Sequence, residues 1–383
     1  MEKILFVTND FPPQSGGIQT FIEGLIKELP HGCVVVHTSS FRDPDAQERY
    51  DQLLLHERGT IVVRDRQRIL LPTPALRKRV AGTIHAHEIK TVVFGASVPL
   101  GLMAPTLRRA GVERIIAITH GHEVWWSKVP LFSALLRKVG RDTDHLTYLG
   151  SFTRRAISKA LNEADRGKLI ALPPGVDVRQ FAPGVKSERL IERYEVRDKT
   201  VILCVGRLVQ RKGQDLLIQA MAQVTRKYPQ AHLLIAGVGN YEARLKKLSE
   251  KLGMTEHISF LGRVPYEELP DLFRVADIFA SPTRDRFGGL EVEGLGIVYL
   301  EASASGIPVI AGRSGGSPDA VQPGASGLVV DGRKVDELVS ALELLLVDDA
   351  KRIAMGASGR RWMESQWSWQ VIGARFRRLL ELD

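Results

Sequence analysis

The sequence predicts an α/β protein made of two Rossmann-like, doubly wound domains. A chain of 383 residues is long for one hydrophobic core and comfortable for two. Short β-branched runs alternate with helical patterns along it, which is typical of βαβ units around a parallel sheet. The segment 173–188 is rich in Pro and Gly, and it separates two such series as a linker would. We therefore expect domains over residues 1–178 and 179–366, followed by a tail, 367–383.

The first series consists of short strands with helices between them. Its helices are expected at Ile18–Leu29, Ala75–Glu88 and Val98–Ala110. Its strands are expected at Lys3–Thr8, Val34–Thr38, Thr91–Phe94, Arg114–Thr119 and Leu146–Tyr148.

The second series repeats this pattern and ends in a helical tail. Strands are expected at Thr200–Val205, His232–Ala236, Ile258–Leu261, Ile278–Ala280, Pro308–Ala311 and Gly327–Val330. Helices are expected at Gln214–Lys227, Tyr241–Leu252, Lys334–Leu346, Ala350–Gln366 and Trp367–Leu382. Ligands of such sheets bind at the carboxyl ends of the strands, so two facing sheets predict a cleft between the domains.

Composition narrows the classes of partner. The net charge is +9, which favours an anionic partner, but no zinc-finger spacing or aromatic RNA-binding strand is present, so we expect no nucleic acid. We expect neither a signal peptide nor a membrane span, because apolar runs stay well short of about 20 residues. The two cysteines, Cys33 and Cys204, lie in apolar runs, which indicates buried thiols and a reducing, cytoplasmic compartment.

In each domain, a glycine-containing loop follows the first strand. In the segment Asp10–Ile18, Gly16 and Gly17 open a helix and allow backbone amides to approach a phosphate; a tight βα turn is an equally good interpretation. In Gly206–Gly213, Arg207 and Lys212 can neutralise a diphosphate, which we favour over a solvated basic loop.

The most specific pattern lies in the segment Glu291–Glu301. Glu293 lies in a loop with Gly294 and Gly296, and Glu301 lies on the helix that follows. Carboxylates in such places accept hydrogen bonds from the hydroxyls of a sugar, and glycines free the amides of the loop to face a ligand. An ordinary helix start with surface acids is the alternative.

Two further loops carry candidate groups. The segment Gly315–Asp319 is a glycine-rich turn suited to a phosphate. His120 follows a strand, and at that position an imidazole can bind a hydroxyl or polarise a leaving group. The spacing of His120 and His122 suggests a metal site, but no third ligand is nearby, so we expect none.

With these residues the chain resembles the retaining glycosyltransferases of family 4, which have the GT-B fold. The resemblance covers nearly the whole chain, and within the family it is strongest to actinobacterial phosphatidylinositol monomannoside mannosyltransferases. The segments that carry it are 8–13, 119–123, 211–215 and 289–301, together with Pro174–Asp177. The sequence departs from the family pattern at Gly150 and at Arg284–Phe287. The resemblance therefore implies the reaction class more strongly than it implies the acceptor or the nucleotide base of the donor.

The resemblance implies a role for each candidate residue. Domain 1, with the tail helix returning to it, is the acceptor domain, and domain 2 binds a nucleotide-sugar donor, GDP-mannose. Glu301 binds the ribose, Glu293 the donor sugar, and His120 lies near the transferred sugar. The remaining donor-binding residues are Gly16, Gly17, Arg207, Lys212, Val264, Gly294, Gly296, Ile297 and Val298. No carboxylate is placed as a nucleophile, so we expect front-face attack without a metal or other cofactor.

Three other classes of protein are alternatives to a transferase. An NAD-dependent oxidoreductase requires a G-x-G-x-x-G loop after a strand, and neither glycine loop has that form. A nucleotide-sugar epimerase would release free sugar, and an inactive scaffold would lack Glu301 or Arg207, which are present. Among transferases, another donor or a soluble inositol phosphate acceptor remains open.

A lipid acceptor would require docking at the inner face of the cell membrane. Two segments fit an interfacial helix: the basic cluster Leu76–Val80, and Val129–Val139 with an apolar stripe beside Arg137 and Lys138. An amphipathic core helix with solvated cations is the alternative for both. We expect peripheral contact with an anionic membrane surface.

Overall fold

The chain divides into two compact units, which a computed structural model describes for residues 2–14 and 16–382. Unit 1 comprises Met1–Gly175 and Trp369–Asp383, and unit 2 comprises Val176–Ser368. The boundary after Gly175 falls in the Pro- and Gly-rich segment that the sequence indicates as a linker. The last helix groups with the N-terminal unit although it follows unit 2 in the chain.

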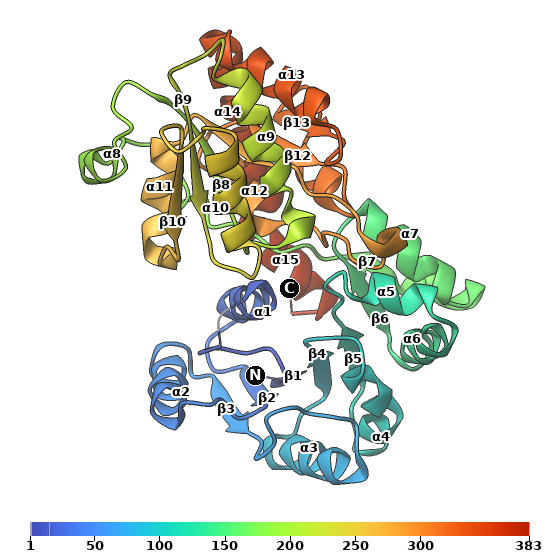
Figure 1. Cartoon of the computed structure of the whole chain (residues 1–383). Helices are drawn as coiled ribbons and strands as arrows, with labels where there is room; N and C mark the ends of the chain where they lie inside the picture. The colour runs from blue at the N-terminus through green and yellow to red at the C-terminus, as the bar shows by residue number, and fades with distance from the viewer. Residues whose placement is uncertain (1, 15, 383) are drawn as a thin grey trace. The chain divides into compact units, whose positions relative to one another are not determined.

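Unit 1 contains a seven-stranded parallel sheet with the order β3-β2-β1-β4-β5-β6-β7 (Figure 1). The two edge strands, β3 and β7, escaped prediction because they are short and only partly buried. The strands are β1 (Ile4–Thr8), β2 (Val34–Thr38), β3 (Ile61–Arg64), β4 (Thr91–Phe94), β5 (Arg114–Ala117), β6 (His145–Tyr148) and β7 (Leu169–Ala171).

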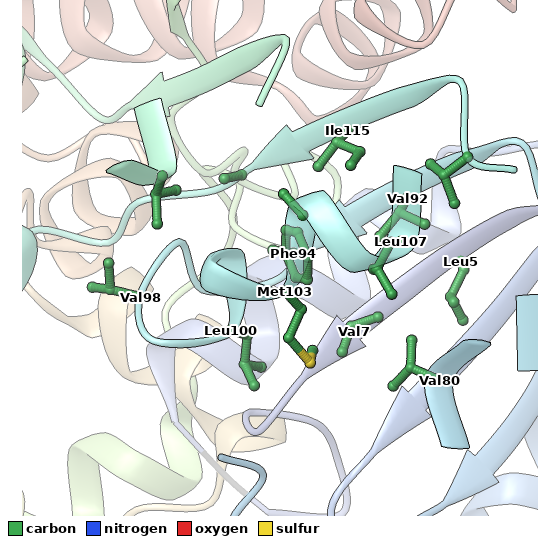
Figure 2. Packing of buried hydrophobic residues seen from close by; sticks show 14 of the residues in the cluster. Leu5, Val7, Val80, Val92, Phe94, Val98, Leu100, Met103, Leu107 and Ile115 are labelled. Atoms are coloured by element: carbon green, nitrogen blue, oxygen red, sulfur yellow. The ribbon is translucent and has the colours of Figure 1, made fainter. Parts of the chain in front are cut away.

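The helices of unit 1 bury their apolar faces against this sheet. Leu100, Met103 and Leu107 meet Val92 and Phe94 in the core that Figure 2 shows. The helices are α1 (Gly17–Lys27), α2 (Pro44–Arg58), α3 (Pro74–His87), η1 (Leu100–Met103), α4 (Ala104–Arg109), α5 (Glu123–Lys128), α6 (Pro130–Asp142), α7 (Ser151–Ala160) and η2 (Glu163–Lys168).

Unit 2 repeats the architecture with six parallel strands in the order β10-β9-β8-β11-β12-β13. The strands are β8 (Thr200–Val205), β9 (Ala231–Ala236), β10 (Ile258–Gly262), β11 (Ile278–Ser281), β12 (Val309–Gly312) and β13 (Gly327–Val330). The helices are α8 (Glu188–Arg193), η3 (Gln210–Lys212), α9 (Gln214–Val224), α10 (Glu242–Lys251), η4 (Tyr266–Glu268), α11 (Leu269–Val275), η5 (Phe287–Gly289), α12 (Ile297–Ala304), η6 (Ser317–Ala320), α13 (Val335–Leu346), α14 (Asp349–Trp362) and η7 (Met363–Trp367).

The strand order identifies where ligands bind in each sheet. In both units the first strand lies between the second and the fourth, so the order of the chain reverses there. The two predicted Rossmann-like domains are thereby confirmed. The reversal points are the β1–β4 edge and the β8–β11 edge, and ligands of open α/β sheets bind outside the carboxyl ends of the strands at such points.

The C-terminal helix α15 (Trp369–Leu379) packs closely on α1 within unit 1. A Cβ atom at Gly24 would lie 2.2 Å from the Trp369 ring, so a side chain there would displace the indole. Phe376 packs on Phe6 of β1, with ring centroids 6.1 Å apart. The absence of a side chain at Gly24 is what lets the two helices approach.

The two segments predicted as interfacial helices differ in the structure. In α6, Leu136 is fully buried and Lys138 pairs with Asp142 at 2.6 Å, whereas Leu131 is 69% exposed, so one face of α6 packs in the core and its contact with a membrane stays a prediction. In α3, the Arg79 guanidinium pairs with Asp65 at 2.7 Å, while Lys78 is exposed. Within residues 2–14 and 16–382, no helix combines the length and apolar character needed to cross a membrane.

Candidate active site

The loop after β8 lies at the reversal point of unit 2 and is held by glycines. Gly213 has φ 75°, and a Cβ atom there would lie 2.0 Å from the carbonyl oxygen of Pro282, which directly follows β11. Glycine is therefore required for the loop to approach β11. The loop carries Arg207, which is exposed, and Lys212, which is 8% exposed. Both predicted diphosphate-binding cations thus lie on the loop after β8, with Lys212 next to the glycine that meets the end of β11.

The side chain of Lys212 pairs with one of the two predicted glutamates. Its Nζ lies 2.8 Å from Oε2 of Glu293, and the same oxygen accepts a hydrogen bond from the Arg211 guanidinium. Burial opposes ionisation of Glu293 most strongly, but the charges and hydrogen bonds of Lys212 and Arg211 together outweigh it and lower the pKa of this carboxyl. Glu293 is therefore a carboxylate at neutral pH.

Glu301 lies in a different environment on α12. It is 5% exposed, and no described residue forms a hydrogen bond or ion pair with its carboxyl group. Burial raises the pKa of Glu301 to about 8. The two glutamates of one motif are thus driven toward opposite protonation states, a condition common at functional sites.

The amino-terminal end of α12 is open to an anion or a hydroxyl. Its N-cap, Gly296, has φ 90° and provides no side chain to cap the helix, so the amides of Ile297 and Val298 have no side-chain partner among the described residues. The first turn contains no acidic residue, and the helix dipole places partial positive charge there. Gly294, Gly296, Ile297 and Val298 therefore form one continuous edge between Glu293 and Glu301.

The segment Gly315–Asp319, which the sequence suggests for phosphate binding, supports the glutamate loop instead. The amide of Gly316 donates to the carbonyl oxygen of Glu293 at 2.8 Å. A Cβ atom at Gly315 would lie 2.1 Å from that oxygen, and one at Gly316 would lie 2.0 Å from the carbonyl oxygen of Gly294. These glycines are needed for backbone packing, and the Gly316 amide is already occupied.

Val264 lies apart from the glutamates, in a small pocket of about 210 Å³. The pocket is formed by residues that follow β8, β9 and β10. Arg207 and Val264 line it together with Gly237, Val238 and Arg263. Val264 is thereby placed beside one of the predicted diphosphate cations.

In unit 1, Gly16 and Gly17 form the start of α1. Gly16 is the N-cap, no side chain caps the helix, and its first turn contains no acidic residue. The amide of Thr20 donates to the carbonyl oxygen of Gly16. The amides of the first turn that precede Thr20 have no side-chain partner in the described residues. This end of α1 has the features of a phosphate-binding helix start.

His120 follows β5, the strand beside β4, and its ring reaches the end of β4. Its Nε2 lies 2.5 Å from the carbonyl oxygen of Gly95, which directly follows β4, so Nε2 carries the proton and Nδ1 is the acceptor. Burial lowers the pKa of His120, which keeps the ring neutral. The ring is held edge-on against Phe21, with centroids 5.6 Å apart.

Sequence reasoning missed the residues that hold these groups in place. Glu123 is fully buried and accepts from the amides of His120 and Gly121 at 2.9 and 3.1 Å, so it shapes the His120 loop. Arg211 holds Glu293. Glu123 and Arg211 both lie inside segments that carry the family resemblance. A charged residue so close in sequence to a candidate residue was the signal that could have identified them. The described residues contain no group of three or more His, Cys, Asp or Glu side chains arranged to hold a metal.

Each unit thus has its own set of groups with the chemistry to bind an anion or a hydroxyl. Unit 2 provides two cations, an open helix end, an ionised carboxylate and a neutral carboxyl, which together suit a diphosphate flanked by hydroxylated rings. Unit 1 provides a second open helix end and a neutral imidazole.

Comparison with known proteins finds a glycosyltransferase family model for each unit. Residues 187–362 match the family model described as glycosyl transferases group 1, and residues 15–180 match the model described as glycosyltransferase family 4. The chain is also similar in fold to HepE from Anabaena, solved in complex with UDP, with a TM-score of 0.80, 20% identity and 99% of each chain covered.

Two relatives are similar over nearly their entire length. A GDP-mannose-dependent alpha-(1-6)-phosphatidylinositol monomannoside mannosyltransferase from Mycolicibacterium smegmatis is 45% identical, with 98% of each chain covered. The enzyme from Corynebacterium glutamicum described as acting on the monoacylated form of that lipid is also 45% identical, over 100% of this chain and 98% of its own. The chain belongs to the family 4 glycosyltransferases, with the GT-B fold.

Proposed function

We propose that the protein transfers mannose from GDP-mannose to a phosphatidylinositol mannoside lipid, with retention of anomeric configuration. The observation that carries this proposal is the 45% identity, over essentially the whole chain, to enzymes named for that donor and that acceptor. The chemistry of the two units agrees with it, because cations, carboxyl groups and open helix starts that suit a diphosphate and its sugars lie in or near the loops that follow strands.

The residues of unit 2 divide the work on the donor. Arg207, Lys212 and the open end of α12 stabilise the departing diphosphate, which is the main electrostatic contribution to catalysis. Glu301 accepts hydrogen bonds from the ribose hydroxyls, and Glu293 accepts hydrogen bonds from hydroxyls of the mannose. The acceptor hydroxyl attacks from the face that the diphosphate leaves and gives its proton to a phosphate oxygen. These cations take the place of a metal ion, so EDTA should leave the rate unchanged.

A donor and acceptor screen with mass-spectrometric detection tests the proposal. We expect the lipid to gain one hexose with GDP-mannose and to gain little or none with UDP-glucose or UDP-galactose. Transfer to inositol phosphate but not to the lipid would show that the acceptor is the soluble inositol phosphate. Release of free sugar without an acceptor product would favour the epimerase alternative.

Replacing His120 with alanine should lower kcat by about 100-fold or more, while KM for the donor changes little. The imidazole is neutral and fixed through Gly95, so its free Nδ1 can accept a hydrogen bond that strengthens in the transition state. Steady-state kinetics with a melting temperature for each variant will check this. Full activity in His120→Ala would make the ring a packing residue against Phe21.

We also propose that the protein works from the cytoplasm and docks on the inner face of the membrane through the segment 66–78. Ile69 and Leu71 are 66% and 51% exposed, and they follow the exposed Arg66 and Arg68, with the exposed Lys78 further along the chain. Exposed apolar residues beside cations are typical of interfacial docking. The two buried thiols, which form no disulfide, fit a reducing compartment.

This docking segment is fixed to the candidate site by one asparagine. Asn9, directly after β1, accepts from the amide of Leu70 at 2.6 Å and donates to its carbonyl at 3.1 Å. The same loop leads to the open start of α1 at Gly16. A lipid surface bound at Ile69 and Leu71 would thus lie close in the fold to the loop that carries a predicted donor-binding glycine.

Vesicle sedimentation should show binding that rises with anionic lipid and falls with salt. Changing Arg66, Arg68 and Lys78 to Ser should remove most of it, since each cation contributes about 1 kcal/mol near an anionic leaflet. The control is Arg226→Ser, which removes one exposed cation of unit 2 and leaves the docking segment intact. Equal binding to neutral and anionic vesicles would contradict the docking proposal.

A further inference from the structure

Glu293 has two cationic partners in the ligand-free protein, both on the loop before α9. Its Oε2 accepts from Nη1 of Arg211 and lies 2.8 Å from Nζ of Lys212. All three side chains are largely shielded from water, with 10–13% of each exposed. A carboxylate in such a place is costly unless a cation or donor stays with it.

The two cations differ in what else they must do. In the proposed function, on which this inference rests, Lys212 binds the donor diphosphate and so turns away from Glu293 when the donor arrives. Glu293 must then stay ionised and oriented toward the donor sugar with one partner fewer. We propose that Arg211 is the positioning residue that holds Glu293 during this exchange, and that it binds no part of the donor.

The surroundings of Arg211 fit a holding role. Its Nε faces Oε1 of Glu291 at 3.6 Å, and the other oxygen of Glu291 accepts from Arg286 at 3.0 Å. The carbonyl oxygen of Arg211 accepts from the amide of Arg284 at 2.9 Å. The guanidinium therefore spans two carboxylates, Glu291 and Glu293, with its backbone tied to the loop that follows β11.

This arrangement also gives a role to the segment Arg284–Phe287, where the sequence departs from the family pattern. Arg284 is fixed to Asp215 of α9 at 2.7 Å, and Arg286 pairs with Glu291. Asp285 accepts from the hydroxyl of Ser314 at 2.7 Å, and Ser314 in turn accepts from the amide of Glu293. The segment thus closes a ring of contacts around Arg211 and Glu293.

An arginine is required at position 211 for a geometric reason. A guanidinium presents several donors in one plane and can contact two carboxylates at once, whereas an ammonium is a single point charge. Arg211→Lys should therefore keep part of the function, and Arg211→Gln should lose it.

The test combines turnover with binding of GDP in five variants of the full chain. Arg211→Gln should lower kcat by about 10- to 100-fold, the scale of one charged hydrogen bond, while Kd for GDP stays within about threefold of the parent. Arg211→Lys should recover part of kcat. The double variant with Glu293→Gln should be no slower than Glu293→Gln alone, because both changes remove the same interaction. Arg226→Gln, an exposed arginine of the same unit, is the control and should match the parent.

Each result has a distinct meaning. If Glu293→Gln is slow and Arg211→Gln equals the parent, the holding role is wrong and the donor site stands. If Glu293→Gln itself equals the parent, the donor-site assignment in the proposed function is wrong. Additive losses, or a GDP affinity that falls as far as kcat, would make Arg211 an independent ligand of the donor. If Arg211→Gln does not fold, Glu291→Gln tests the holding role by removing the second carboxylate that the Arg211 guanidinium contacts. We expect a smaller loss of kcat in that variant.

Discussion

Replacing Glu301 with glutamine should abolish tight binding of GDP and at the same time stabilise the ligand-free protein at alkaline pH. The carboxyl group is buried without a partner among the described residues, and its pKa is raised to about 8. A donor ribose supplies two hydroxyls to a carboxylate, which an amide cannot accept in the same way. Loss of such a charged, buried contact corresponds to about 10- to 100-fold in Kd or more.

The stability effect has a defined sign. The folded carboxyl holds its proton up to about pH 8, and in the unfolded chain it releases it near 4.5. Stability therefore falls as pH rises from about 4.5 to 8, and Glu301→Gln removes that loss. The variant should melt above the parent at pH 8–9 and near it at pH 5. Glu250→Gln, an exposed glutamate on α10, is the matched control and should shift neither curve.

Titration calorimetry with GDP in buffers of different ionisation enthalpy adds a direct readout. If the ribose binds the ionised form, the parent should release a proton near pH 7, and its affinity should rise by up to about tenfold per pH unit until pH 8. The variant should show no release. A parent that binds GDP without proton release would contradict the assignment of Glu301 to the ribose.

Replacing Arg207 or Lys212 with methionine should weaken GDP binding by about 10- to 100-fold and leave guanosine binding nearly unchanged. Both cations lie on the loop after β8, but their present surroundings differ, because Arg207 lines the pocket with Val264 and Lys212 contacts Glu293. Arg207 is exposed, so Arg207→Met should fold like the parent. Lys212→Met removes one partner of Glu293 and leaves Arg211, so it should also lower kcat.

Calorimetry with GDP and guanosine on the same preparations checks this prediction. The ratio of the two affinities isolates the diphosphate, because guanosine lacks only the phosphates. Unchanged GDP affinity in both variants would show that the diphosphate binds elsewhere. An equal loss for GDP and guanosine would indicate damage to the fold of the loop.

Much of the fold followed from the sequence because the central strands are continuous apolar runs. The bounds expected for β2, β4, β8 and β13 agree with the structure. The edge strands β3 and β7 were missed, since an edge strand is buried on fewer sides and leaves a weaker pattern. The helix expected at Val98–Ala110 is a short 3-10 turn followed by α4, because Pro99 and Pro105 interrupt regular hydrogen bonding.

The candidate site was predictable as a set of residues but not as a set of charge states. Spacing placed Glu293 in a loop and Glu301 on a helix, as the structure has them. It could not show that Lys212 and Arg211 share one oxygen of Glu293 while Glu301 has no partner among the described residues, because those contacts join segments about 80 residues apart. Long-range pairing, and the pKa values that depend on it, require the folded chain.

The most direct test of the proposed activity is an NMR spectrum of the lipid product formed from carbon-13-labelled GDP-mannose. We predict one labelled mannose attached to the phosphatidylinositol mannoside through an α-linkage, with GDP as the other product and no labelled free sugar. A β-linked product would contradict retention. Labelled free mannose with unchanged lipid would contradict the assignment as a lipid mannosyltransferase.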